Sequence, residues 1–511
     1  MLTLACLPDP FSLELSLAFE DVALLLRQPE LRIPGTKRTL AARATRPNTV
    51  ARATRQSLVW HDTPEGALAA DGLALAQRQT GAGTSWRLER LLPEDASVAP
   101  PGAPAAIISD TTAPPPPFAG RLLPVAAFDG QERTLTPPGA AVQVVLLQGE
   151  LRAVAATRPI ARVVLTGPGA GALACDWAAR MRLQAPGQSL AAEALAQAGR
   201  PLPARRLGAP SLAGARTVDD GFALVVAHLA GVILHHAPGA RLGFELEPVH
   251  QMRVALRRLR SAILLFRRAV ACAQLDAVAE QLKQLGRALG PPRDWDVFTT
   301  GTGHAVGLAF ADDPAVMALL AAAARKRAQG YAALADMLDG AGWRSIGIGL
   351  ADLALRRPWR EVASDTAEQA AKRAELLPVA MADFAARALS RRLEGVTRAG
   401  PDLSGLDVAA LHDIRLAGKR LRYAAEFFAP LFPGGATRRF LRRMTALQEH
   451  LGHLNDAAVA RALVAEIAGR GAASQYAAGA ISGFVAAGAQ GSRRKIERSW
   501  QRFLRQEPFW N

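Results

Sequence analysis

The stretch VHQMRVALRRLR, residues 249–260, decides the fold of the larger part of this chain, because a similar stretch, LHDIRLAGKRLR, follows at residues 411–422. Both place apolar residues at the three- and four-residue spacing of a helix. The first contains four arginines and one histidine and no acidic residue. A helix that concentrates so much uncompensated charge beside an apolar stripe calls for an explanation.

The two stretches belong to a longer internal repeat with an offset of 162 residues (412 − 250). The same offset, with no gap, also aligns further pairs of residues: Phe266 with Phe428, Leu285 with Leu447, Leu289-Gly290 with Leu451-Gly452, Asp294 with Asp456 and Val297 with Val459. Chance does not produce several matching blocks in one register. We therefore predict two related helical units that pack around a pseudo-two-fold axis.

Each repeat presents its cations on one face of a helix, since side chains three and four residues apart are neighbours. The candidate binding residues are His250, Arg253, Arg257 and Arg260 in the first repeat, and His412, Arg415, Lys419 and Arg422 in the second. Like charges at this spacing cost roughly 0.2–0.5 kcal/mol per pair. Their duplication favours an anion site over the alternative, an ordinary solvated charged face.

Arginine suits phosphate because its forked donors engage two oxygens and keep their charge at any relevant pH. The histidines add donors, so affinity would rise as pH falls; the alternative is that both are neutral packing residues. Arg258 and Arg420 point elsewhere and are either accessory ligands or internal partners of Asp294 and Asp456. Arg439 and Arg443 are further accessory candidates. No catalytic or metal-binding group accompanies either face.

The overall charge also calls for an anionic partner, since 61 Lys and Arg stand against 45 Asp and Glu, a formal net charge of +16. Residues 1–217 hold 22 cations and 17 anions (net +5), which leaves 39 and 28 (net +11) for the remainder. Three separated cysteines fit neither a disulfide framework nor a metal knuckle. With no leader and no membrane span expected, the sequence predicts a cytoplasmic protein.

The chain divides into two parts of different composition. Residues 1–200 show short alternating strands, among them AAVQVVLLQGELRAVAA from Ala140 with a predicted Gln-Gly hairpin turn, and a Pro-rich loop, APPGAPAAIISDTTAPPPPF. Residues 201–217 resemble a linker. Residues 218–511 are helical, with breaks predicted at Pro238-Gly239 and Pro291-Pro292 and with repeat units of about 218–380 and 381–511.

The helical part resembles the CHAD domain, the conserved histidine α-helical domain, through VHQMRVALRRLRSAILLF with LGPPRDWDV and LHDIRLAGKRLRYAAEFF with LGHLNDAAVA. The resemblance implies an all-helical pseudo-symmetric fold that binds inorganic polyphosphate, in many members on polyphosphate granules. Carried onto this chain, it assigns the binding to the two sets of four cations above.

Residues 1–200 resemble a degenerate CYTH domain, the triphosphate-tunnel β-barrel, through LVWHDTPEGALAADGLALAQRQ and QVVLLQGELRAVAATRPIARVVL. The fold class expected is thus multidomain α+β: an antiparallel β-barrel followed by an all-α domain. The opening Glu-x-Glu-x-Lys of that family corresponds to Ser12-x-Glu14-x-Ser16, its first strand arginine to Ala76 before the retained Arg78, and its late Glu-x-Glu to Arg162-Val163-Val164.

These departures remove most of the carboxylates that would hold a divalent cation for triphosphate hydrolysis. We expect no metal, no cofactor and no triphosphatase activity. The barrel remains a scaffold or an accessory phosphate binder, and five arginines are candidates for the latter role: Arg78, Arg87, Arg90, Arg121 and Arg133.

Three functions stay open on the sequence. The leading prediction is binding of inorganic polyphosphate, with other polyanions as secondary ligands. The first alternative is a divergent metal-dependent triphosphatase. The second is a nucleic-acid binding protein; it ranks lower because no aromatic residue interleaves the basic helices to stack bases, and we expect no specific nucleic-acid partner.

Overall fold

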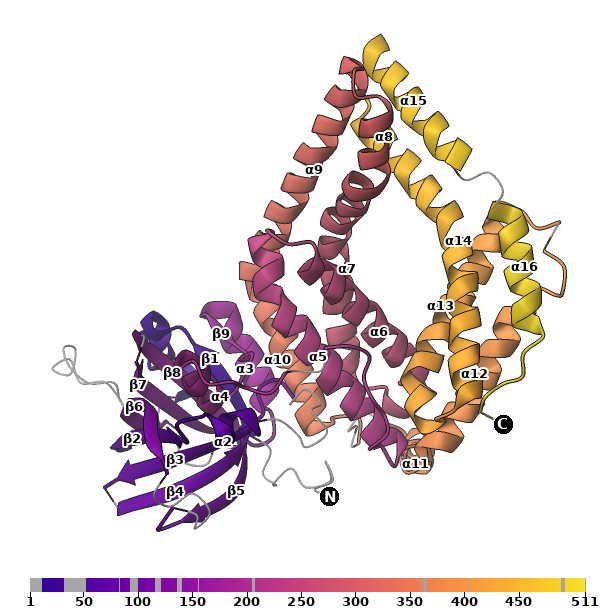
Figure 1. The fold of residues 1–511 in the computed structure, drawn as a ribbon. Helices are drawn as coiled ribbons and strands as arrows, with labels where there is room; N and C mark the ends of the chain where they lie inside the picture. The colour runs from indigo at the N-terminus through magenta and orange to yellow at the C-terminus, as the bar shows by residue number, and fades with distance from the viewer. Residues whose placement is uncertain are drawn as a thin grey trace. The chain divides into compact units, whose positions relative to one another are not determined.

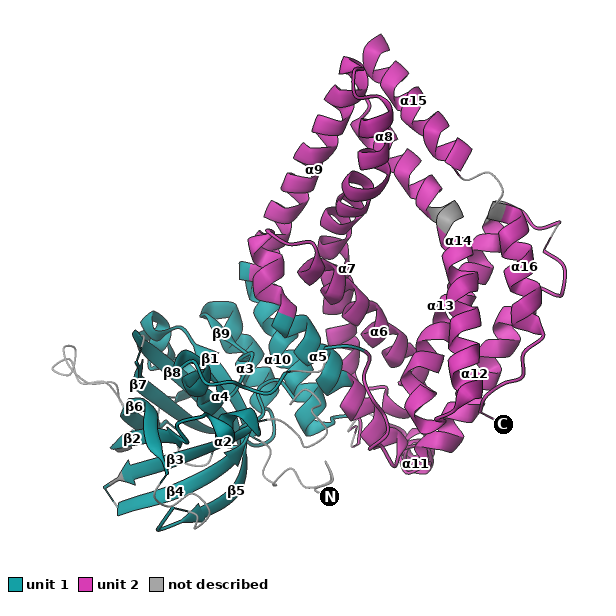
Figure 2. Cartoon of the chain, viewed as in Figure 1, with its two compact units in different colours: residues 1–208, 226–235, 339–358 teal, residues 209–225, 236–338, 359–511 magenta. Residues whose placement is uncertain are grey.

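A computed structural model describes residues 12–31, 52–81, 83–91, 100–114, 121–135, 140–154, 156–204, 207–360, 362, 365–403, 405–488 and 492–510. The chain forms two compact units (Figure 2). The sheet unit consists of residues 1–208, 226–235 and 339–358, and the helical unit of residues 209–225, 236–338 and 359–511. Each unit is therefore built from separate stretches of the chain.

The sheet unit contains a nine-stranded sheet in the order β5-β4-β3-β2-β6-β7-β8-β1-β9, with antiparallel pairing throughout (Figure 1). The strands are β1 (Ser12–Leu17), β2 (Arg52–Asp62), β3 (Leu73–Thr80), β4 (Gly83–Arg90), β5 (Ala106–Thr111), β6 (Leu123–Thr134), β7 (Gln143–Ala153), β8 (Ala156–Thr166) and β9 (Leu183–Gln184). Among the described residues the sheet is open, with β5 and β9 at its edges. The prediction of a closed barrel is wrong; the antiparallel sheet is confirmed.

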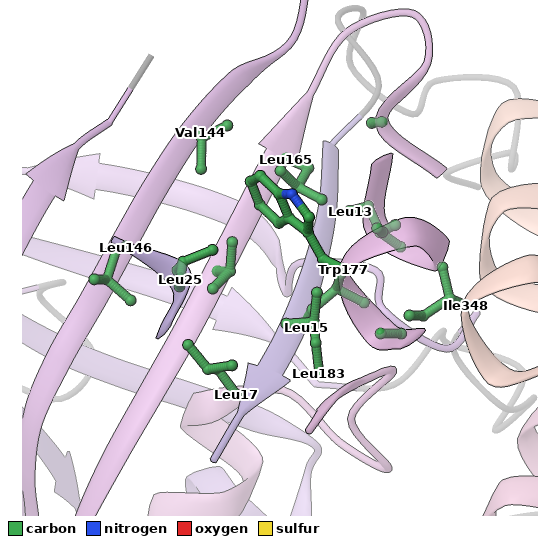
Figure 3. Packing of buried hydrophobic residues seen from close by; sticks show 14 of the residues in the cluster. Leu13, Leu15, Leu17, Leu25, Val144, Leu146, Leu165, Trp177, Leu183 and Ile348 are labelled. Atoms are coloured by element: carbon green, nitrogen blue, oxygen red, sulfur yellow. The ribbon is translucent and has the colours of Figure 1, made fainter. Parts of the chain in front are cut away.

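One face of the sheet is apolar and packs against helices. Leu13, Leu15 and Leu17 alternate along β1 and are buried, as the two-residue period of a strand requires. They meet Trp177 of α3 (Ala170–Arg180) and Ile348 of α10 (Ala341–Arg356) in one core (Figure 3). The sheet unit also contains five short helices: η1 (Phe19–Asp21), α1 (Val22–Leu25), η2 (Pro29–Leu31), α2 (Ala67–Ala70) and α4 (Leu190–Gln197).

Two local predictions in this unit are wrong. β7 continues through Gln148-Gly149, where a hairpin turn was predicted, and the chain turns instead after Ala153, since Ala153 pairs with Ala156. Gly149 faces Gly130 of β6, and a side chain at either glycine would strike the opposite backbone. Gly149 is thus needed for close strand approach rather than for a turn. The Pro-rich segment contains strand β5, while its residues 115–118 lie outside the described residues.

The helical unit is built from long helices (Figure 1). The elements after residue 217 are α5 (Val218–Leu242), α6 (Glu247–Val270), α7 (Ala273–Val297), the π-helix η5 (Phe298–Thr302), α8 (Gly303–Ala309), α9 (Pro314–Asp339), α11 (Ala367–Leu376), α12 (Met381–Thr397), α13 (Val408–Phe428), η6 (Ala429–Leu431), α14 (Gly435–Ile467), α15 (Ala472–Gly488) and α16 (Ser492–Leu504), with parts of α5 and all of α10 assigned to the sheet unit. The predicted helical half is confirmed.

Two predicted helix breaks are absent. Pro238 lies inside α5, and Pro291 and Pro292 lie inside α7. Proline costs a helix one backbone hydrogen bond but does not forbid continuation when packing holds the helix in place. Pro292 is buried, and Gly330 of α9 lies against it so closely that an added Cβ would stand 3.0 Å from the Pro292 nitrogen.

The two repeats meet as a two-fold relation requires. Phe266 of α6 and its equivalent, Phe428 of α13, pack with ring centroids 6.3 Å apart. The following helices, α7 and α14, begin at Ala273 and Gly435, which also differ by 162. A residue that contacts its own equivalent lies at the symmetry axis.

The repeats also exchange one packing pair. In the first, Leu256 of α6 faces Gly286 of α7; in the second, Gly418 of α13 faces Gln448 of α14. The large residue has moved from one helix of the pair to the other, so the total volume between the helices is kept.

Among the described residues, α5 is the one helix long and apolar enough to cross a membrane, and 78% of its most apolar 18-residue window is buried inside the protein. Such burial is typical of the core helix of a globular domain.

Candidate functional site

The eight predicted cations lie on two helices whose apolar stripes fix the direction of the charged faces. In α6 the stripe of Met252, Leu256 and Leu259 is buried, and in α13 Ile414 and Leu421 are buried. Helix α6 starts with Pro248 in its first turn, where the missing amide costs nothing. Asp407 caps α13 by accepting a hydrogen bond of 2.8 Å from the Ala410 amide.

The basic faces of both helices reach the surface of the helical unit. Arg257, Arg260 and His412 are exposed. The other five candidates are half-buried: His250, Arg253, Arg415, Lys419 and Arg422. The eight residues together are called the paired basic surface below.

The structure brings the two helices' cations together at the centre of this surface. Burial, together with repulsion from Arg415, Arg257 and Arg422, lowers the pKa of Lys419 to about 8, and Asp456 offsets a small part of this. Burial also lowers the pKa of Arg415; attraction by Asp456 offsets part of this, and repulsion from Arg257 adds to it. Since Arg257 belongs to α6 and the others to α13, the two repeats contribute to one electrostatic site.

Carboxylates neutralise only part of this charge. Arg253 lies 3.4 Å from Asp294 and donates to the Leu289 carbonyl at 3.1 Å, and Arg422 lies 3.6 Å from Glu426. In the described ranges, Arg257, Arg260, Arg415 and Lys419 form no ion pair, and the buried Nε of Arg415 has no hydrogen-bond partner. A cation that loses water without a partner is costly, so the free surface favours an incoming anion.

Arg258 and Arg420 behave differently from each other. Arg258 donates to Glu426 of α13 at 2.9 Å, and this ion pair joins the two repeats. The idea that Arg258 binds Asp294 is therefore wrong, because Asp294 is held by Arg253. Arg420 is exposed and close enough to Arg392 of α12 to help lower its pKa, after burial. Arg439 and Arg443 are exposed on α14.

Sequence reasoning missed Arg293, which belongs to the site. Burial lowers the pKa of His250 most, and the nearest charge that adds to this is Arg293 of α7, ahead of Arg257 and Arg253. His250 is therefore neutral at neutral pH and takes a proton only below its ordinary range. Arg293 stands in the block LGPPRDWDV, but its counterpart in the second repeat is Asn455, so the duplication gave no signal for it.

The second candidate region is the face of the sheet opposite the core of β1, called the polar face below, where charged side chains lie beside a second apolar core that includes Trp60, Phe128 and Leu195 of α4. Residues opposite each other in paired strands share a face, and the registers place Glu14, Arg78, Arg87, Glu132 and Arg162 on this one. Arg90 lies on the other face of β4. Arg133 pairs with Leu146 on the core side of the sheet, and Arg121 precedes β6, so the strand registers place neither on the polar face.

The arginines on this face form ion pairs with carboxylates of the sheet unit. Arg162 is 3% exposed; it lies 3.6 Å from Glu14 and donates to Glu193 of α4, which Arg158 also contacts. Arg78 pairs with Glu132 at 3.4 Å and Arg87 with Asp110 at 2.9 Å. Burial raises the pKa of Glu14, and Arg162 offsets part of that rise. Arg162 thus forms ion pairs with Glu14 and Glu193 inside the sheet unit.

Within the described parts of the chain, no three His, Cys, Asp or Glu side chains gather in a group that could hold a metal ion. The carboxylates of the polar face point to the same conclusion, because Glu14 and Glu193 engage guanidinium groups. Among the described residues, these two carboxylates are therefore paired with arginine rather than free for a divalent cation.

Comparison with known proteins identifies one family. Residues 224–465 match the model of the CHAD domain. The predicted CHAD domain is thereby confirmed, and its presence is consistent with polyphosphate-related binding in general. The match does not reach the sheet of residues 12–184, where the CYTH resemblance stays a prediction.

Two solved structures are similar to the helical part. One is the crystal structure of the CHAD domain from the plant Ricinus communis, 27% identical, which covers 59% of this chain and 97% of its own, with a TM-score of 0.49. The other is PptA from Streptomyces chartreusis, 20% identical, with coverage of 56% and 100% and a TM-score of 0.42. No curated protein matches the chain.

Proposed function

We propose that this protein binds inorganic polyphosphate through the paired basic surface. One observation carries the proposal: Arg257 of the first repeat and Arg415 and Lys419 of the second lie close enough together that their repulsion adds to burial in lowering the pKa of Lys419, while Asp456 offsets only part of the effect and none of the three cations forms an ion pair among the described residues. A flexible polyanion that follows both helices relieves this repulsion. Each phosphate it presents also releases counterions, so binding is steeply salt-dependent.

Polyphosphate suits the surface better than nucleic acid. The cations are predominantly arginines, which engage phosphate oxygens in pairs. The aromatic residues beside them are buried: Phe266, Phe427 and Phe428 are fully covered and Tyr423 is 6% exposed. Bases would find no stacking platform. We infer that a cytoplasmic protein of this kind associates with polyphosphate granules.

We infer a structural role for the sheet unit. Its relation to the triphosphate-tunnel fold rests on the sequence resemblance, and the ion pairs of Glu14 and Glu193 with arginine oppose metal-dependent triphosphate hydrolysis. Tripolyphosphate incubated with the protein and Mg²⁺ or Mn²⁺ is expected to release no phosphate above the blank.

The test of polyphosphate binding is a double charge reversal, Arg257→Glu with Arg415→Glu, measured by co-sedimentation and by titration of long-chain polyphosphate at two salt concentrations. We expect affinity to fall at least about a hundredfold, because each truncated charge pair at a desolvated contact costs 2–5 kcal/mol. The matched control is Arg268→Glu with Arg325→Glu, which changes net charge equally at two exposed arginines outside the surface. Equal loss in both variants would refute a localised site.

A further inference from the structure

The two repeats differ sharply on the helix that follows the basic one. Four arginines occupy the first turns of α14: Arg438, Arg439, Arg442 and Arg443. Subtracting 162 gives their counterparts on α7: Asp276, Ala277, Glu280 and Gln281. Formal charge at equivalent positions thus changes from −2 to +4. The duplication kept the paired basic surface and reversed the charge of this neighbouring face.

The acidic side chains of the first repeat are satisfied by neighbours. Asp276 pairs with Arg267 at 2.9 Å, and Glu280 pairs with Lys283 at 2.6 Å. The four arginines of the second repeat are all exposed, and none forms an ion pair with a described residue. Arg443 makes a different contact: it donates to the Arg502 carbonyl of α16 at 3.3 Å.

Helix α16 adds to the same face. Its apolar residues Ile496, Trp500 and Phe503 are buried, and Phe503 packs against Phe440 of α14 with ring centroids 5.8 Å apart. Helix α16 lies beside α14 (Figure 1), and the stripe opposite these buried residues is exposed. This stripe carries exposed arginines: Arg498, Arg502 and Arg505. Together with the four arginines of α14 they form what is called the outer arginine surface.

The outer arginine surface adjoins the paired basic surface through the repeat geometry. In the first repeat, the hydrogen bond from Lys283 lowers the pKa of Glu280 most, and Arg287 and then Arg260 contribute less. The counterparts of Glu280 and Arg260 in the second repeat are Arg442 and Arg422. An arginine and a glutamate of the first repeat thus correspond to two arginines in the second, and α14 packs against α13, so the two surfaces lie on neighbouring helices.

The chemistry of this surface fits a phosphate chain. Rows of arginines one helical turn apart are spaced by about 5.4 Å, and Phe440, Trp500 and Phe503 are buried and offer no stacking face. We propose that the outer arginine surface receives the continuing part of a polyphosphate chain that leaves the paired basic surface, so that the protein prefers long chains. This proposal rests on the polyphosphate binding proposed above and adds to it a preference for long chains.

The experiment compares tripolyphosphate, long-chain polyphosphate and single-stranded DNA by titration, for the wild type and for a variant that reverses all four arginines of α14 (Arg438→Glu, Arg439→Glu, Arg442→Glu, Arg443→Glu). We expect the variant to lose about tenfold or more in affinity for long-chain polyphosphate and to bind tripolyphosphate as the wild type does. An Arg→Gln version of the same four positions, with an unchanged circular dichroism spectrum and melting temperature, checks that the loss does not come from unfolding. A charge-matched control reverses four exposed arginines elsewhere: Arg268, Arg325, Arg398 and Arg461.

The outcomes separate this proposal from the function on which it rests. If the wild type binds neither polyphosphate, the proposed function fails. If it binds both through Arg257 and Arg415, but the four-arginine variant keeps the full affinity for long chains, the function stands and the outer surface proposal is overturned. A variant that loses DNA binding alone also overturns it, in favour of a nucleic-acid surface.

Discussion

The polar face of the sheet and the paired basic surface both concentrate arginine, yet they treat its charge in opposite ways. Arg162 is buried between Glu14 and Glu193, while Arg257, Arg415 and Lys419 crowd one another without paired carboxylates in the described chain. Removing an arginine that is paired inside the fold leaves a buried carboxylate uncompensated and destabilises the protein. An arginine that has no paired carboxylate lowers the stability of the fold, and its charge stays available to bind an anionic ligand. The number of arginines in a region therefore says less about binding than the position of the carboxylates.

The largest effect that tests this contrast is the loss of Arg162. Arg162→Met leaves the buried Glu14 without its partner and Glu193 with Arg158 alone, which typically costs about 3–5 kcal/mol. Denaturant titration, with amide exchange of β8 to localise the effect, measures it. Arg152→Met is the control, since the Arg152 pair with Asp129 at 2.7 Å is half exposed and worth about 0–1 kcal/mol. Equal effects of the two substitutions would mean that the buried network adds nothing.

A second prediction concerns the pH dependence of polyphosphate binding. Free Lys419 loses its proton near pH 8, whereas a bound polyanion raises the pKa of its ammonium. Affinity is then full below pH 8 and falls as pH rises above it, by at most about tenfold per unit for one proton, or 1.4 kcal/mol. Lys419→Arg should flatten the profile between pH 8 and 10, because guanidinium stays charged. A wild-type profile flat over that range would contradict the proposed position of Lys419 in the site.

The smallest effect has the opposite sign from the first. Arg415→Gln removes a half-buried cation whose Nε has no partner and for which burial and repulsion from Arg257 outweigh the attraction of Asp456. The free energy of unfolding should therefore rise by about 0.5 kcal/mol, the scale of one like-charge pair. Arg258→Gln on the facing helix is its counterpart: it breaks the pair with Glu426 and should lower stability. Thermal melts of the two variants in low salt give the comparison. Arg415→Gln below the wild type would show that its charge is compensated after all.

The internal duplication made much of the helical unit predictable. A helix repeated at a fixed offset has to serve the same packing, so the apolar stripes, the basic faces and the contact of Phe266 with Phe428 follow from the alignment of the two copies. Arg293 was not predicted as a site residue because its counterpart in the second repeat is not basic. The helices that continue through Pro238 and Pro291 were not predicted, because tertiary packing outweighs the local cost of proline.

The sheet unit was less predictable for a related reason. Its strands were recognisable from alternation, but whether a sheet closes depends on the pairing of its two edges, which no local pattern encodes. Gly149 shows the same limit: the dipeptide Gln-Gly is typical of a turn, and only the opposing Gly130 reveals that it serves close strand approach.

The exchanged packing pair has a practical consequence for anyone who builds chimeras of the two repeats. Grafting α6 in place of α13 alone would bring Leu256 against Gln448, two large side chains where one fits, while grafting α7 in place of α14 alone would set Gly286 against Gly418 and leave a hole. The helices of each repeat can be transplanted only as hairpins, so the unit of modular inheritance in this fold is the pair.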